Sequence, residues 1–151
     1  MKEIIFSFFE NPLAEEYYNM VDSALTDSSS YSELSSEIDN IILLVNSNLN
    51  GKDWDIVMIY AETIKASAEF WFPENIGGSG KGYSLRSSKM ANKGANVSKT
   101  QVADWVKADG RGAGYASVTW AVGAALAGGP VAPVTYFAAV VGGALWKSFA
   151  P

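Results

Sequence analysis

Two residue types are missing from this chain of 151 residues, which contains no cysteine and no histidine. The lack of cysteine excludes disulfides, thiolate nucleophiles, zinc fingers and cysteine-ligated iron–sulfur clusters. The lack of histidine excludes imidazole general bases, Ser-His-Asp triads, HExxH zinc sites and histidine-ligated haem. We therefore predict no catalytic residue, no metal site and no cofactor, and leave open which small molecule, if any, the protein binds.

Phosphate-binding and acid–base motifs are also missing. The run at residues 77–82 contains a Gly-Lys pair, but a P-loop requires GxxxxGK[ST] between a strand and a helix. Here Gly82 follows the lysine, and a predicted helix precedes the run. Acid–base catalysis requires two carboxylates in one pocket, and most carboxylates of this chain fall on polar faces of predicted helices. The sequence therefore indicates a protein that is not an enzyme.

Charge is distributed unevenly along the chain. Residues 1–74 carry fourteen acidic and three basic side chains, a net charge of −11, whereas residues 75–151 carry two acidic and eight basic ones, a net charge of +6. The total of −5 argues against nucleic acid as a partner, because the acidic part repels phosphate. We name seven of the basic residues the basic connector: Lys81, Arg86, Lys89, Lys93, Lys99, Lys107 and Arg111. We expect the connector to contact anionic lipid headgroups or the acidic part of the same chain.

Residues 1–74 are predicted to form a small acidic helical body. The apolar stretch at residues 4–9 is short for a signal peptide, follows Glu3 and lacks a small-x-small cleavage site. We expect this stretch to pack on the body instead. Asn11 followed by Pro12 is typical of a helix start, with asparagine at the N-cap and proline at the first helical position.

Two further helices are predicted in the body. The first begins near Ser30, because Ser30 and Glu33 have the spacing of a capping box, and it ends near Gly51, which suits the left-handed position at a helix end. The second is predicted to begin with Asp53 as its N-cap and to end at Pro73. The short connection favours an antiparallel helical hairpin. The apolar stripes of the three helices are Leu13, Tyr17, Met20, Val21 and Ala24; Leu34, Ile38, Ile41, Ile42, Val45 and Leu49; and Ile56, Val57, Tyr60, Ile64, Ala68 and Trp71.

The middle of the chain is rich in glycine, serine and lysine. Residues 75–97 are predicted to be a basic linker containing at most a short helix near residues 85–93. A short helix is expected over residues 98–111, because Ser98 and Gln101 have capping-box spacing. Within this helix, Val102, Trp105 and Val106 share a face, and Gly110 and Gly112 interrupt it.

The C-terminal part, residues 112–151, is apolar and rich in glycine and alanine. Residues 113–146 are 34 positions without charge, and Pro130 and Pro133 divide them. We expect a hairpin of two helices, at about residues 115–127 and 134–148, each shorter than the roughly 20 residues that cross a bilayer. The residues expected to pack the helices closely or to lie at a membrane interface are Trp120, Gly123, Ala127, Gly142, Gly143, Trp146 and Lys147.

This tract resembles the glycine-rich tracts of small two-peptide-type bacteriocins. The resemblance is carried by residues 123–130 (GAALAGGP) and 141–144 (VGGA), covers about 40 residues and is largely compositional. It implies permeabilisation of target membranes through packed helices. The bacteriocin precursors are short and carry a double-glycine leader, whereas here an acidic body of about 70 residues precedes the tract. The chain is also similar to uncharacterised small bacterial proteins with a helical front and a Gly/Ala-rich end, which implies no activity.

The sequence thus predicts an all-α protein: a small helical bundle, a basic Gly/Ser-rich linker and a C-terminal apolar helical hairpin. The first functional hypothesis is a non-enzymatic, membrane-active or self-associating protein of the bacteriocin or toxin type, with a lipid bilayer or further copies of the chain as partners. The alternative is a soluble all-α interaction or assembly subunit in which the hairpin is buried as core. No signal peptide is recognised, and the cellular location stays open.

Overall fold

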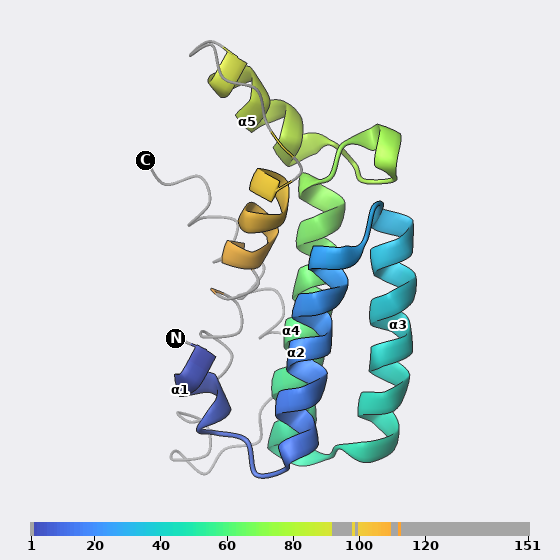
Figure 1. The fold of residues 1–151 in the computed structure, drawn as a ribbon, viewed down its shortest axis with the longest axis vertical. Helices are drawn as coiled ribbons and strands as arrows, with labels where there is room; N and C mark the ends of the chain where they lie inside the picture. Colours follow the sequence, from blue (N-terminus) through green and yellow to red (C-terminus); the bar gives the residue numbers. More distant parts are fainter. Residues whose placement is uncertain (1, 92–97, 99, 110–111, 113–151) are drawn as a thin grey trace.

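The computed structural model describes residues 2–91, 98, 100–109 and 112, and within them every regular element is helical (Figure 1). This confirms the all-α prediction for the described part of the chain. The predicted hairpin lies outside the described residues except for Gly112. The elements are α1 (Lys2–Phe6), α2 (Pro12–Asp27), α3 (Tyr31–Asn48), α4 (Gly51–Trp71), a 3-10 turn (Glu74–Ile76) and α5 (Lys81–Ala91), followed by helical residues 100–109.

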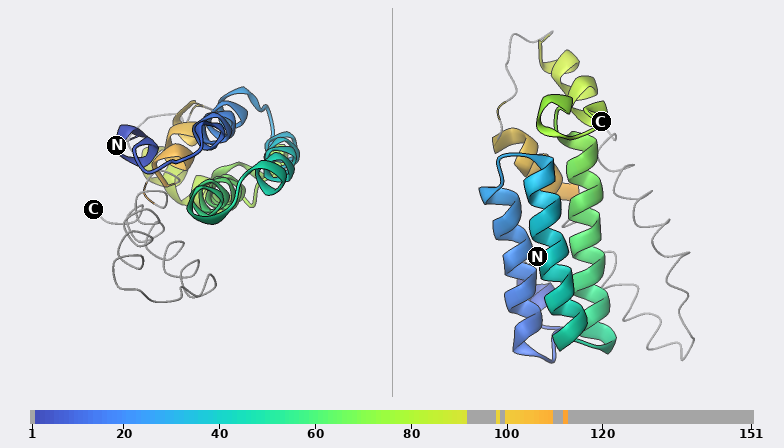
Figure 2. Two further views of the ribbon diagram at one scale, coloured as in Figure 1. Left: turned by 90° about the horizontal axis from the view of Figure 1, so that it is seen from below. Right: turned by 90° about the vertical axis from the view of Figure 1, so that its right-hand side faces the viewer.

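Three long helices form the body of the molecule. Helices α2, α3 and α4 each pack against the other two, and short connections make neighbours in sequence run antiparallel (Figure 1). The end-on view in Figure 2 shows them around a shared axis, with residues 100–109 next to α2 and α4. The predicted helical hairpin of the body is therefore present as α3 and α4.

The helix starts follow from local capping. The Asn11 side chain accepts a hydrogen bond from Leu13 N at 3.0 Å, and Ser30 Oγ accepts one from Glu33 N at 3.2 Å. The Glu33 carboxylate reaches Ser29 and accepts from both its amide and its hydroxyl. These side chains satisfy amide groups that have no partner inside the helix, as expected from the sequence.

The start of α4 differs from the prediction. Its N-cap is Asn50, three residues before Asp53, and the Asn50 side chain makes no capping hydrogen bond. Gly51 adopts the left-handed conformation expected of it, with φ of 55°, but it is the first residue of α4 and does not end α3. The prediction that Asp53 caps this helix is wrong, because its carboxylate binds a distant part of the backbone, described below.

The core lies between the three long helices. Every predicted apolar position of α4 is buried, as are Leu34, Ile38, Ile41 and Val45 of α3. On α2 the stripe is shifted, because Leu13 is exposed while its neighbour Ala14 is fully buried. The N-terminal stretch packs on the body as predicted: Ile5 is buried, and the Phe6 ring meets the Tyr18 ring edge-on at 5.6 Å. Large apolar side chains of four segments thus share one core.

The glycine-rich run after α4 forms a tight turn. Gly77 and Gly80 have φ values of 90° and 67°, which few other residues adopt without strain. Ser79 N donates to Glu69 O at 2.6 Å, and Gly80 N donates to Phe72 O at 3.0 Å. These bonds fold the chain back onto the end of α4. Helix α5 then begins at residue 81, four residues before the short helix that we predicted in this stretch.

Helical residues 100–109 begin with a complete capping box. Gln101 N donates to Ser98 Oγ at 3.2 Å, and Ser98 N donates to Gln101 Oε1 at 2.8 Å, as the spacing predicts. Val102 and Val106 are buried, and Trp105 is half-buried. The predicted apolar face of this helix therefore packs on the body.

Candidate functional site

The structure places part of the basic connector at the upper end of the bundle in Figure 1. Lys81, Arg86 and Lys89 belong to α5, and Lys107 belongs to helical residues 100–109. Lys107 Nζ donates to Thr26 Oγ1 at 2.8 Å, which brings a connector cation to the end of α2. The connector residues Lys93, Lys99 and Arg111 lie outside the described residues. So do all the predicted packing and interface residues, Trp120, Gly123, Ala127, Gly142, Gly143, Trp146 and Lys147.

A buried carboxylate lies where residues 100–109 meet α4. Asp109 is only 7% exposed, and its Oδ2 accepts a hydrogen bond from Ser67 Oγ at 2.9 Å and one from Trp71 Nε1 at 2.5 Å. Burying a charge is costly unless hydrogen bonds compensate for the lost water. Both donors lie on one face of α4, four residues apart, so docking on α4 supplies this compensation.

Arg86 covers the same place from α5. Its guanidinium carbon is 4.8 Å from the centre of the Trp105 ring and 5.8 Å from the centre of the Trp71 ring. The two indole rings are 5.2 Å apart and tilted by 55°. A cation over an indole face is attracted by the negative face of the ring. We name Ser67, Trp71, Arg86, Trp105 and Asp109 the junction cluster, because they join α4, α5 and residues 100–109.

The sequence patterns did not identify Asp109 or the role of Trp71 as a hydrogen-bond donor. One pattern in the sequence does point to Asp109. It follows Val102 and Val106 at helical spacing, so an acidic side chain lies on an otherwise buried face. Its partners Ser67 and Trp71 are 42 and 38 residues away, and no local rule identifies them.

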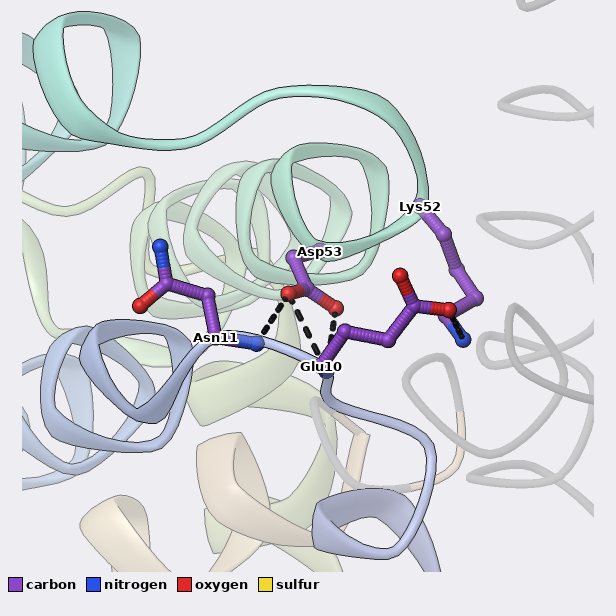
Figure 3. A network of polar contacts seen from close by, with 4 residues as sticks. All are labelled: Glu10, Asn11, Lys52 and Asp53. Carbon is purple, nitrogen blue, oxygen red and sulfur yellow. Dashed lines mark hydrogen bonds and ion pairs between the residues drawn. The ribbon is translucent and has the colours of Figure 1, made fainter.

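A second polar site lies at the start of α4, where it meets the turn before α2 (Figure 3). Asp53 is 6% exposed, and its carboxylate accepts hydrogen bonds from Asn11 N at 2.7 Å and from Glu10 N at 3.1 and 3.2 Å. Beside it, Lys52 Nζ pairs with Glu10 Oε1 at 2.8 Å, and this bond lowers the pKa of the Glu10 carboxyl. These groups line an open hollow of about 430 Å³. Both oxygens of the Asp53 carboxylate accept hydrogen bonds from backbone amides, so we assign Asp53 a structural role.

A buried tyrosine pair lies in the middle of the core. The Tyr18 and Tyr60 rings stack with centres 3.8 Å apart and planes 11° from parallel. The Tyr60 hydroxyl donates a short hydrogen bond to Asp22 Oδ1. Burial, with the nearby Tyr18 and Asp22 groups, raises the pKa of the Tyr60 phenol far above its ordinary value. The neutral phenol is therefore part of the folded core.

We expect a Tyr60→Phe variant to be less stable by about 1–2 kcal/mol at pH 8, because it loses a buried hydrogen bond to a carboxylate. The difference should shrink as the pH rises. An unfolded tyrosine ionises near pH 10, so the stability contributed by the neutral phenol is complete below about pH 10 and is lost above it. Urea unfolding at pH 8, 9.5 and 11 measures this, with Tyr31→Phe as control. A difference that stays constant over this range would contradict the assignment.

Within the described residues, no three acidic side chains come together to hold a metal ion. No helix in that part of the chain has both the length and the apolar character needed to cross a bilayer. The two carboxylate sites described above, at Asp53 and Asp109, hold separate segments of the chain together through hydrogen bonds. The chain matches no protein-family model, no curated protein and no solved structure.

Proposed function

We propose that the chain is a non-enzymatic, membrane-active or self-associating protein of the bacteriocin or toxin type, in which residues 112–151 insert into a bilayer or oligomerise. One observation carries this proposal: 34 consecutive uncharged residues, rich in glycine and alanine, follow a strongly charged helical part. Such a segment is favourably transferred from water into an apolar environment, and its small residues allow helix backbones to approach closely.

Electrostatic attraction is the proposed control of this activity. Residues 1–74 carry a net charge of −11, and residues 81–111 carry seven basic and two acidic side chains, a net charge of +5. The hydrogen bond from Lys107 to the neutral Thr26 hydroxyl supports this proposal, because it puts a connector cation at the end of α2, next to the exposed Asp27 in sequence. An anionic membrane competes with the acidic body for the connector.

Acidification should favour membrane binding. Carboxylates lose their charge as the pH falls toward their pKa values, so the acidic body attracts the connector less. Burial raises the pKa of the Asp55 carboxyl, which therefore takes up its proton at a higher pH than an ordinary aspartate. The pairing of Glu10 with Lys52 has the opposite effect and keeps the Glu10 carboxyl charged to lower pH.

Flotation of the full chain with liposomes tests the proposal. We expect more bound protein with anionic than with neutral vesicles, and more at pH 5 than at pH 7. A variant lacking residues 112–151 should stay in the soluble fraction while keeping its helical circular dichroism. A Gly123→Leu variant should lose vesicle leakage and keep a folded helical body, because the larger side chain separates helices that pack through glycine.

Three results would count against the proposal. Leakage retained by Gly123→Leu would contradict packing through that residue. Full-length protein that stays soluble under all four conditions would contradict membrane binding and favour the soluble assembly subunit. Its mass in solution would then show how many copies associate. A deletion variant that unfolds would also favour this alternative, because the deleted segment would be part of the core.

A further inference from the structure

We infer that residues 100–109 form a strap whose docking on α4 and α5 controls the release of the segment that follows them. This inference rests on the proposed function and adds its regulation. The strap is the last described helix before the uncharged residues 113–146, and Asp109 lies four residues before they begin. The anchored end of the strap is therefore next to the segment that is proposed to insert.

Two different elements hold the strap. Helix α4 holds its end, because Ser67 and Trp71 donate hydrogen bonds to the Asp109 carboxylate at 2.9 and 2.5 Å. Helix α5 holds its middle, because the Arg86 guanidinium lies 4.8 Å from the Trp105 ring centre. Between these contacts the Val106 side chain is completely buried. The strap is thus fastened by a few identifiable side chains.

These contacts suit reversible docking. Residues 100–109 are a short helical stretch, and short helices are marginal in water on their own, so the strap depends on its contacts with the body. When the strap detaches, water replaces the hydrogen bonds of Asp109, so separation exposes a group that is readily hydrated. Segments held by few buried contacts are those that open most easily in a folded protein.

Arg86 makes the docking of the strap sensitive to an anionic membrane. It belongs to the basic connector, it is exposed, and its guanidinium lies over the two indole rings. A lipid phosphate forms a stronger, bidentate contact with a guanidinium than a ring does. An anionic headgroup that draws Arg86 away from Trp105 therefore removes one of the contacts that hold the strap.

A single cysteine reports strap docking directly. The chain has no cysteine, so Val106→Cys places the only thiol at a buried position of the strap. Its reaction rate with a thiol reagent measures how often the strap opens. In this background, Asp109→Asn is compared with Asp104→Asn, which removes the same charge from an exposed position of the strap. Arg86→Gln is compared with Lys81→Gln, which removes the same charge from an exposed position of α5.

We expect Asp109→Asn to react at least about tenfold faster than Asp104→Asn. Arg86→Gln should react about two- to fivefold faster than Lys81→Gln, because an exposed cation–π contact is weaker than buried hydrogen bonds to a carboxylate. Without the cysteine reporter, both variants should also release dye faster from vesicles containing phosphatidylglycerol at pH 7. Circular dichroism checks that α2, α3 and α4 stay folded. Arg86→Gln provides the test if Asp109→Asn does not fold, because Arg86 is exposed.

The outcomes separate the strap from the proposed function. Thiol reaction at the same rate in variants and controls would overturn the strap. Faster thiol reaction without faster dye release, in a protein whose parent does release dye, would overturn its control of the segment. If no form of the protein releases dye, the proposed membrane function fails. Faster thiol reaction in that case still supports a strap that docks through Asp109 and Arg86.

Discussion

An Asp53→Ala variant should lose about 2–4 kcal/mol of stability, because the partly buried amides of Glu10 and Asn11 lose a charged acceptor. This is a large share of the free energy of unfolding of a small domain, which is about 5–15 kcal/mol in total. The carboxylate joins the start of α4 to the turn before α2, two places that are more than 40 residues apart (Figure 3). Its removal frees that turn and weakens the packing of α1.

Urea unfolding at pH 7 measures the effect, and Asp55→Ala is the matched control. Asp55 lies on the same helix, two residues further on, and is exposed overall, although partial desolvation of its carboxyl raises its pKa. The charged form of Asp55 is thus disfavoured in the folded state, so its removal should not destabilise the protein at this pH. Equal losses in the two variants would contradict the special role of Asp53.

Alanine at Gly78 or Gly82 should destabilise the turn between α4 and α5 by about 1–3 kcal/mol or more, because no space exists for a side chain. A Cβ at Gly78 would lie 2.1 Å from the carbonyl oxygen of Phe72, a main-chain atom. A Cβ at Gly82 would lie 2.5 Å from Phe70 Cε1 and 2.6 Å from Trp71 Cε3. Relief of these overlaps requires the backbone or two packed aromatic rings to move.

Gly112→Ala is the control for this pair. No atom of the described residues lies within 4 Å of a Cβ built at Gly112, and the residue is helical, as Gly82 is. Alanine is a better helix former than glycine by about 1 kcal/mol, so this variant should be neutral or more stable. Thermal unfolding of the three variants gives the comparison. If Gly82→Ala were as stable as Gly112→Ala, the close packing of α5 on α4 would be refuted.

The helical body could be predicted from local patterns in the sequence. The caps at Asn11, Ser30 and Ser98 involve residues at most three positions apart, and the apolar stripes repeat every three to four residues. Leu13 shows the limit of this approach, because it fits the stripe of α2 but is exposed. Ala14 is buried instead, because the face that α2 buries depends on the helices around it.

The candidate site was predicted only in part. The connector residue Arg86 was chosen for its charge, yet its observed partners are the rings of Trp71 and Trp105. The run at residues 77–82 has the composition of a flexible linker, but it forms a turn closely packed on Phe70, Trp71 and Phe72. Composition describes the range of conformations open to glycine, whereas its neighbours in space select one of them.

Local patterns and composition predict the helical character of the body, the places where most of its helices start, and the separation of an acidic front from a basic middle and a nearly uncharged end. These properties arise from side chains a few residues apart and from composition. The partners of Asp53 and Asp109 depend on how the helices pack, because their hydrogen bonds join residues 38 to 43 positions apart. A buried carboxylate requires donors that surround it in space, and packing of the helices determines which donors those are.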